Sequence, residues 1–237
     1  MNAQMSSISK NKINKNNFKI KNKYYTNQYN LFDASSRIFD ILFSSFLLIL
    51  FSPIILTISF IIKLYSPEGN IFFTQKRLGL DGKLFNVYKF RTMIPNAEEI
   101  LKEILEKDSH LKKEYLTFRK LKNDPRIIPK IGNFLRKTSL DELPQFFNVL
   151  FNDMSIVGPR PYILNEFDVY PTKLQQNIIS SIKPGITGYW QIIPERHDTT
   201  FQYRVNKDIE YIEKKNFILN LKIIAQTINV MVLKKGA

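Results

Sequence analysis

The longest hydrophobic stretch of the chain covers residues 38–62 and reads IFDILFSSFLLILFSPIILTISFII, with Asp40 as its only charged residue. As a single helix these 25 residues would extend about 37 Å, which is longer than the bilayer core of about 30 Å. Ser52-Pro53 lies near the middle, where a proline removes one helical hydrogen bond and clashes with the preceding turn. The stretch therefore predicts an apolar helix that is kinked at Ser52-Pro53.

Basic residues flank this stretch on both sides. Arg37 and a lysine-rich tail precede it, and Lys63, Lys76 and Arg77 follow it. A spanning helix would leave one basic flank on the outer face, against the positive-inside tendency, whereas a helix that dips into one leaflet and returns keeps both flanks in the cytosol. A re-entrant hairpin, a kinked span and a buried core helix all stay open, and the charges favour the hairpin.

The apolar stretch divides the chain into a tail (residues 1–36), a membrane helix (37–63) and a globular domain (64–237). Residues 1–30 are rich in Asn, Ser and Lys and contain no acidic residue. Such a composition cannot bury a core, so we expect a disordered or partly ordered basic tail. It is either a solvated leader or a tether to anionic lipid headgroups.

The hydrophobic pattern of the globular region predicts short strands and several helices. The segments 71–75 (IFFTQ) and 84–90 (LFNVYKF) suggest two strands joined by a turn at Asp81-Gly82. Asn96 with Glu99 resembles a capping box, which predicts a helix over 97–121. Further helices are expected over 143–151 and 217–233, the last either packed in the core or lying along a lipid interface. We expect an α/β fold, mainly helical with a small β-hairpin, in which the membrane hairpin and interfacial amphipathic helices surround a compact domain.

Composition limits the chemistry that the chain can perform. It carries 35 Lys and Arg against 21 Asp and Glu, for a net charge of +14, which points to an anionic partner. Without cysteine it has no disulfide, thiol nucleophile or cysteine zinc site, and with two histidines it has no multi-histidine metal site. Acid–base or nucleophilic chemistry therefore falls mainly on carboxylates, hydroxyls or lysines. No nucleic-acid-binding motif, Walker loop or dinucleotide fingerprint is present, so we expect no nucleic-acid partner.

The strongest candidate for chemistry is the pair Asp141-Glu142 in residues 136–145, RKTSLDELPQ. One interpretation is structural, because Ser139 and Glu142 have the spacing of a capping box. The other places the helix start at Pro144, which suits a first helical position and leaves both carboxylates outside the helix. The sequence does not decide between the two.

Cationic side chains recur in the segments around this pair, and several adjoin a glycine or proline. Arginine matches phosphate oxygens with a planar, bidentate fork, and loop positions converge on ligands. Scattered surface charges are the alternative interpretation. The candidates are Arg77, Lys89, Arg91, Arg126, Arg136, Arg160 and Lys183.

Taken in order, the motifs RIFD, FSP, FTQKRLGLDGKLFNVYKFRTM, NDPRI, LRKTSLDELPQFFNVLFNDMSIVGPRP and KPGITG resemble the bacterial sugar transferases known as monotopic phosphoglycosyl transferases. The resemblance covers about residues 36–233 and looks like the minimal catalytic unit. It implies transfer of a phospho-sugar from a UDP-sugar to a polyprenyl phosphate, usually undecaprenyl phosphate, at the cytosolic face of the bacterial inner membrane. It also implies a re-entrant membrane helix broken at Ser52-Pro53.

The resemblance also implies roles for individual residues. Asp141 matches the expected nucleophile, and Glu142 its partner, with both expected to bind Mg²⁺. The expected substrate-binding residues are Arg77, Lys89, Arg91, Arg136, Arg160, Pro161, Lys183, Arg196 and Asp208. Arg196 lacks the glycine that often precedes it in the family, and Asn220 stands where an aspartate is common.

These expectations agree with the physical chemistry of the site. Nearby Arg136 should lower the pKa of Asp141 and keep it ionised at neutral pH. Mg²⁺ and arginines can neutralise a diphosphate that a carboxylate must approach. The alternative function is a non-catalytic membrane scaffold of a glycan-assembly complex. The sequence leaves the sugar and any homo-oligomerisation open.

Overall fold

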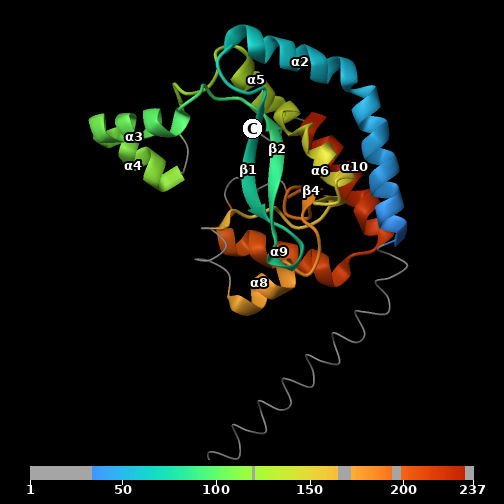
Figure 1. Cartoon of the computed structure of the whole chain (residues 1–237). Helices are drawn as coiled ribbons and strands as arrows, with labels where there is room; N and C mark the ends of the chain where they lie inside the picture. The colour runs from blue at the N-terminus through green and yellow to red at the C-terminus, as the bar shows by residue number, and fades with distance from the viewer. Residues whose placement is uncertain (1–33, 119–120, 165–171, 194–198, 233–237) are drawn as a thin grey trace, which may run out of the picture.

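The computed structural model describes residues 34–118, 121–164, 172–193 and 199–232. The predicted basic tail therefore lies outside the described residues except at its end, where Ala34 already begins the first helix. The globular elements gather into one body, which the first helix borders along one side (Figure 1).

The predicted kink is present in the apolar stretch. The helix Ala34–Leu50 and the helix α2 (Ser52–Tyr65) are bent by 59° relative to each other, with Phe51 between them. Pro53 lies in the first turn of α2, where its missing N–H costs no helical hydrogen bond. Among the described residues no single helix is long and apolar enough to cross a bilayer, whereas this bent pair has the length and composition when taken together.

Much of the bent pair's apolar surface is not covered by protein. Ile49 and Leu56, on either side of the break, are 75% and 70% exposed. The pair contacts the body through a second set of side chains, of which Ile58 and Ile62 are buried against α5 and β2. The other large apolar side chains that the pair exposes are Ile38, Ile41, Leu42, Phe46, Leu50, Ile54, Phe60 and Leu64.

The predicted β-hairpin is confirmed. Strands β1 (Phe72–Leu78) and β2 (Leu84–Phe90) pair antiparallel, and a 3₁₀ turn over Leu80–Gly82 joins them. Asp81 and Gly82 have positive φ angles of 56° and 72°, as expected for the tight Asp-Gly turn. Since Val87 and Phe90 of β2 are buried, the hairpin lies on the core and presents Lys89 towards the site described below.

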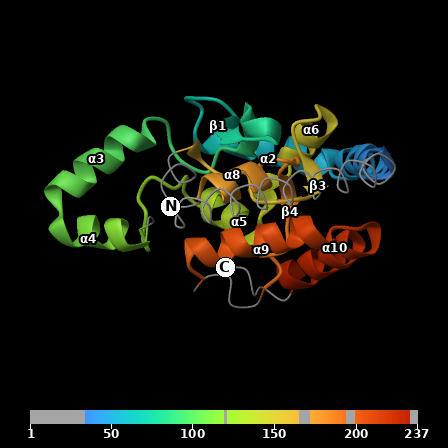
Figure 2. The same ribbon diagram turned by 90° about the horizontal axis from the view of Figure 1, so that it is seen from below.

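The single helix predicted over 97–121 is wrong. The segment forms α3 (Ala97–Lys107) and α4 (Ser109–Phe118), which project from the body (Figures 1 and 2). Asp108 separates them because its Oδ1 accepts the backbone N–H groups of His110 and Leu111, as an N-cap does. The predicted capping box is also absent: Asn96 is left-handed, with φ 58°, and makes no side-chain capping bond.

The remaining elements form the core. Two short strands, β3 (Ser155–Val157) and β4 (Gly185–Thr187), pair in parallel. Helix α6 (Gln145–Leu150) contacts β3, whereas α5 (Ile131–Thr138) packs against α2, and α8 (Lys173–Ile179) packs against α9 (Phe201–Lys214). Helices α9 and α10 (Phe217–Val232) lie on the side of the body away from β1 (Figure 2). The predicted helix over 217–233 is confirmed as α10, and Ile223 is fully buried in the core while Ile218 is 65% exposed.

Candidate active site

Asp141 and Glu142 lie in a 3₁₀ turn between α5 and α6. The turn covers Leu140–Glu142, and α6 begins at Gln145 with Pro144 at its N-cap. Ser139 is left-handed, with φ 57°, and makes no side-chain capping bond, so the capping-box interpretation is wrong. The structure supports the second interpretation, in which both carboxylates stand before the helix and are free for other contacts.

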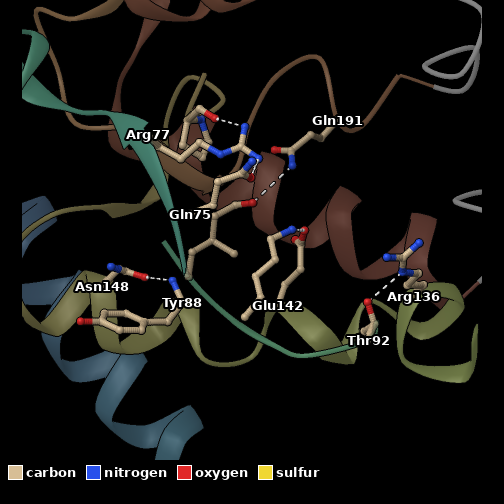
Figure 3. A network of polar contacts seen from close by, with 11 residues as sticks. Gln75, Arg77, Tyr88, Thr92, Arg136, Glu142, Asn148 and Gln191 are labelled. Atoms are coloured by element: carbon tan, nitrogen blue, oxygen red, sulfur yellow. Dashed lines mark hydrogen bonds and ion pairs between the residues drawn. The ribbon is translucent and has the colours of Figure 1, made fainter. Parts of the chain in front are cut away.

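Glu142 pairs with the lysine that the β-hairpin supplies. Lys89 Nζ of β2 lies 2.5 Å from Glu142 Oε1, and the two side chains are 28% and 34% exposed. Glu142 is labelled in Figure 3. Burial alone would raise the pKa of Glu142, but the charges of Lys89, Arg160 and Arg77 outweigh it and hold that pKa below its usual value. Glu142 is therefore ionised at neutral pH.

Asp141 has the opposite shift, which corrects the expectation that Arg136 keeps its pKa low. Burial, followed by the negative charge of Glu142, raises the pKa of Asp141 to about 6, and the opposing charges of Lys89 and Arg136 do not compensate. Two adjacent carboxylates thus differ in proton affinity, a pattern typical of sites that assign them different roles.

Arg136 reaches the site from the last turn of α5. Its Nε donates to Thr92 Oγ1 at 2.9 Å (Figure 3), and the side chain is otherwise exposed. Helix α5 approaches this segment closely at Gly132, where an added Cβ would lie 2.5 Å from the carbonyl oxygen of Thr92. The absence of a side chain at Gly132 therefore lets Arg136 reach Thr92.

The other wall of the site comes from β1 and from the segment after β3. Arg77 Nη1 donates to the Pro161 carbonyl at 3.0 Å, and Arg77 Nη2 donates to Gln75 Oε1 at 2.5 Å (Figure 3). The Arg160 guanidinium lies 5.5 Å from the ring centroid of buried Trp190. Since Arg77 and Arg160 both stabilise ionised Glu142, the structure brings these predicted residues together around the carboxylate pair.

Asp208 supports this wall from α9. Its fully buried carboxylate accepts the Tyr162 hydroxyl at 2.6 Å and the Arg160 backbone N–H at 3.2 Å through Oδ2. Burial outweighs these hydrogen bonds and raises the pKa of Asp208 to about 7, and burial beside Asp208 also raises the pKa of Tyr162. Asp208 therefore orients the backbone that carries Arg160.

Two of the predicted substrate-binding residues, Arg91 and Lys183, form hydrogen bonds with residues other than the carboxylate pair, and a third lies outside the described residues. Arg91 is buried and donates to the carbonyls of Ser66 at 2.6 Å and Glu68 at 2.7 Å, at the end of α2. Lys183 Nζ donates to Asn152 Oδ1 at 2.5 Å. Arg196 lies outside the described residues.

Asn148 supports the site but was not among the predicted site residues. Fully buried on α6, it accepts the Tyr88 backbone N–H at 2.9 Å (Figure 3). It also donates to the Asn86 carbonyl at 2.7 Å. The Asn148 amide thus makes the two backbone hydrogen bonds with β2 that a neighbouring strand would otherwise make. These bonds fix the position of Lys89 relative to the turn that carries Glu142. An asparagine within the apolar pattern FFNVL was the available signal, because a buried polar side chain needs partners.

The donor set at the turn fits a magnesium ion only in part. Two adjacent carboxylates are suitable oxygen ligands, but the described residues contain no group of three or more acidic or histidine side chains that could hold a metal. Mg²⁺ commonly binds one or two carboxylates together with substrate phosphates and water. The residues therefore fit an ion that arrives with a phosphate ligand.

Comparisons with known proteins show the family to which the chain belongs. The model of the family described as bacterial sugar transferase matches residues 29–234. An undecaprenyl-phosphate galactose phosphotransferase of Salmonella typhimurium is 41% identical over 214 residues, which cover 89% of this chain and 44% of that protein. A UDP-glucose:undecaprenyl-phosphate glucose-1-phosphate transferase of Klebsiella pneumoniae is 42% identical over 197 residues, covering 81% of this chain and 39% of that protein.

A third relative has a similar length to this chain. The exopolysaccharide production protein ExoY of Sinorhizobium fredii is 38% identical over 203 residues, which cover 86% of this chain and 88% of ExoY. This chain thus spans less than half of the Salmonella and Klebsiella relatives and most of ExoY. The extent of the family match and these identities show that the chain belongs to the bacterial sugar transferase family.

Proposed function

We propose that this chain transfers a sugar phosphate from a UDP-sugar to a polyprenyl phosphate, as a membrane step of glycan assembly. The observation that carries the proposal is the turn with Asp141 and Glu142, whose carboxylates differ in pKa and face Lys89, Arg136 and Arg160. A cation-lined carboxylate pair suits a diphosphate, because the cations offset the repulsion between the two anions. The printed names of the Salmonella and Klebsiella relatives support undecaprenyl phosphate as the acceptor.

Asp141 is the nucleophile of this proposal. Its carboxylate oxygen attacks the sugar-bearing phosphorus of the UDP-sugar, and the phosphorus–oxygen bond to UMP breaks, so that UMP leaves with the bonding electrons. An oxygen of the polyprenyl phosphate then attacks the same phosphorus, and the bond to Asp141 breaks, which yields polyprenyl-diphospho-sugar and free Asp141. Covalent catalysis splits one difficult transfer between a water-soluble donor and a lipid into two steps.

The neighbouring residues have supporting roles in this reaction. Ionised Glu142, held by Lys89, and Asp141 would hold Mg²⁺ together with the donor phosphates; a bound Mg²⁺ neutralises phosphate charge. Arg136, Arg160 and Arg77 stabilise the charge that develops on the phosphoryl oxygens. Asp208 acts indirectly, through the backbone of Arg160.

The proposal places the bent helix pair in the cytosolic leaflet of the inner membrane as a re-entrant hairpin. Its uncovered apolar side chains, together with those of α10, provide the surface that such an insertion needs. Basic residues on both sides of the hairpin favour a position in which both flanks stay on one side. The catalytic turn would then lie near the headgroups, where the phosphate of the acceptor lies.

The experiment that tests the function measures UMP release by the full chain with Mg²⁺, with and without undecaprenyl phosphate. UDP-galactose and UDP-glucose are the first donors, as suggested by the names of the relatives. We expect stoichiometric UMP release without acceptor and turnover with it. A non-catalytic scaffold predicts no UMP from any donor, and that result would refute the proposal.

A further inference from the structure

The helix Ala34–Leu50 carries two charged side chains, one turn apart, that contact the body rather than lipid or solvent. Arg37 Nη1 donates to the Val149 carbonyl at 2.6 Å, and Arg37 Nη2 donates to the Leu150 carbonyl at 3.1 Å. These carbonyls belong to the last two residues of α6, at a helix end where a positive charge is favourable.

Asp40 makes the complementary contact with β3. Its buried carboxylate, 6% exposed, accepts the Ser155 hydroxyl at 2.7 Å and the Ile156 backbone N–H at 3.1 Å. A carboxylate in a helix that is otherwise apolar is costly to bury, and these two hydrogen bonds offset part of that cost. Arg37 and Asp40 together are called the clamp below.

The clamp contacts the two segments that lead to opposite walls of the active site. Helix α6 follows directly after the turn that contains Asp141 and Glu142. Strand β3 leads, through Gly158 and Pro159, to Arg160. One turn of this helix is therefore hydrogen-bonded to the segment that follows the carboxylate turn and to the strand that leads to Arg160.

Apolar side chains of this helix also contact the body. Phe39 and Phe43 pack against the cluster formed by β3, α9 and α10. Apolar contacts are largely non-directional, so they permit small shifts along the helix axis, whereas bidentate hydrogen bonds to fixed carbonyls do not. The clamp is thus the part of the contact that sets how far the active site stands from the membrane hairpin.

Resting on the proposed function, we propose that Arg37 and Asp40 are positioning residues that hold the phospho-sugar on Asp141 at the height of the lipid phosphate. The water-soluble donor can approach the site at any height, but the bilayer fixes the height of the acceptor phosphate. A displacement of about 1 Å in a reacting group can cost about 100-fold in rate. Loss of the clamp therefore slows the second step and spares the first.

The donor step survives because other contacts hold the carboxylate turn. Lys89 pairs with Glu142, and Asn148 ties α6 to β2, and neither contact involves the membrane helix. The variant Arg37→Gln removes the clamp's cation. The matched control is Lys63→Gln at the other end of the hairpin, where Lys63 Nζ also donates to two backbone carbonyls, of Pro67 at 2.8 Å and Gly69 at 3.3 Å.

The experiment compares three rates of the full chain in vesicles of phosphatidylethanolamine and phosphatidylglycerol. These are the UMP burst without acceptor, transfer to undecaprenyl phosphate in the vesicles, and transfer to a short-chain, water-soluble isoprenyl phosphate. For Arg37→Gln we expect transfer to undecaprenyl phosphate to fall about ten-fold or more, while the burst and transfer to the short acceptor change less than about two-fold. Lys63→Gln should leave all three rates near wild type.

Other results would overturn the inference. If Arg37→Gln lowers the UMP burst as much as transfer to undecaprenyl phosphate, the clamp stabilises the whole active site and does not act on the second step alone. If Lys63→Gln lowers transfer to undecaprenyl phosphate as much as Arg37→Gln does, the loss results from removing any positive charge from the hairpin. Arg37→Lys, which keeps the charge but not the bidentate fork, covers the case in which Arg37→Gln fails to fold, and it should show a smaller loss confined to lipid transfer. A wild-type protein that releases no UMP would instead refute the proposed function, and the inference with it.

Discussion

The pH dependence of the donor step tests whether Asp141 is the nucleophile. Only the ionised carboxylate is nucleophilic, and burial, followed by the charge of Glu142, raises the pKa of Asp141 to about 6. At subsaturating UDP-sugar and Mg²⁺, where the rate reports the free protein, about 91% of Asp141 is ionised at pH 7 and about 9% at pH 5, so the UMP burst rate should fall about ten-fold between these values. Measuring the burst without acceptor avoids titration of the lipid phosphate.

Two neutral substitutions should move the acid limb of this profile in opposite directions. Glu142→Gln removes the like charge that raises the pKa of Asp141, so its limb should lie at lower pH than that of wild type. Lys89→Gln removes a cation that lowers the same pKa, so its limb should lie at higher pH. Each profile is compared with its own plateau, because both substitutions also reduce the maximal rate.

Asp208 is the control for this experiment, because burial raises its pKa to about 7, within the same window. Asp208→Asn should leave the limb at about 6, since Asp208 contacts Arg160 and Tyr162 and not Asp141. The reasoning would be refuted by a profile that is flat from pH 5 to 7, or by a limb that disappears in Asp208→Asn and is unmoved in Glu142→Gln.

Three further predictions concern the scaffold and the membrane segment. Asn148→Leu leaves the backbone N–H of Tyr88 and the carbonyl of Asn86 without their partner, so the free energy of unfolding measured in urea should fall by about 2–5 kcal/mol. The control Asn133→Ala, at an exposed position of α5, should lower it by less than about 0.5 kcal/mol. Gly132→Ala places a Cβ 2.5 Å from the Thr92 carbonyl, so the same measurement should show a loss of about 1–3 kcal/mol; an unchanged midpoint would contradict the close approach of α5. Because the chain has no cysteine, the variants Lys23→Cys and Asn70→Cys each carry a single site for a thiol label, one on each side of the hairpin. We expect a membrane-impermeant maleimide to label neither variant in intact cells. Labelling of Lys23→Cys alone would indicate a helix that crosses the whole bilayer.

Local rules predicted the elements whose cause is local. The aromatic-rich strands β1 and β2, the Asp-Gly turn and the helix break beside Pro53 all follow from short-range sterics and pairing, and the structure confirms them. The break at Asp108 was also readable, because Asp108 is followed by free N–H groups that it can cap, but the long apolar stripe concealed it.

What the sequence could not supply depends on contacts between distant residues. The raised pKa of Asp141 results first from burial, which no local pattern reveals, whereas the nearby arginine was visible and suggested the opposite shift. The contact of Arg91 with the end of α2, rather than with the carboxylates, requires knowing where residues 66 and 68 lie relative to β2. Asp40 was recognisable as the only charge in the apolar stretch, but its partners, Ser155 and Ile156, are more than a hundred residues away.

The most direct test of the central claim is the mass of the intact protein after incubation with a UDP-sugar and Mg²⁺ in the absence of acceptor, followed by peptide mapping. We predict a mass increase of one sugar phosphate, located on the peptide that contains Asp141, removed by added polyprenyl phosphate and absent in Asp141→Asn. An adduct on another residue, or an Asp141→Asn protein that retains full turnover, would contradict it.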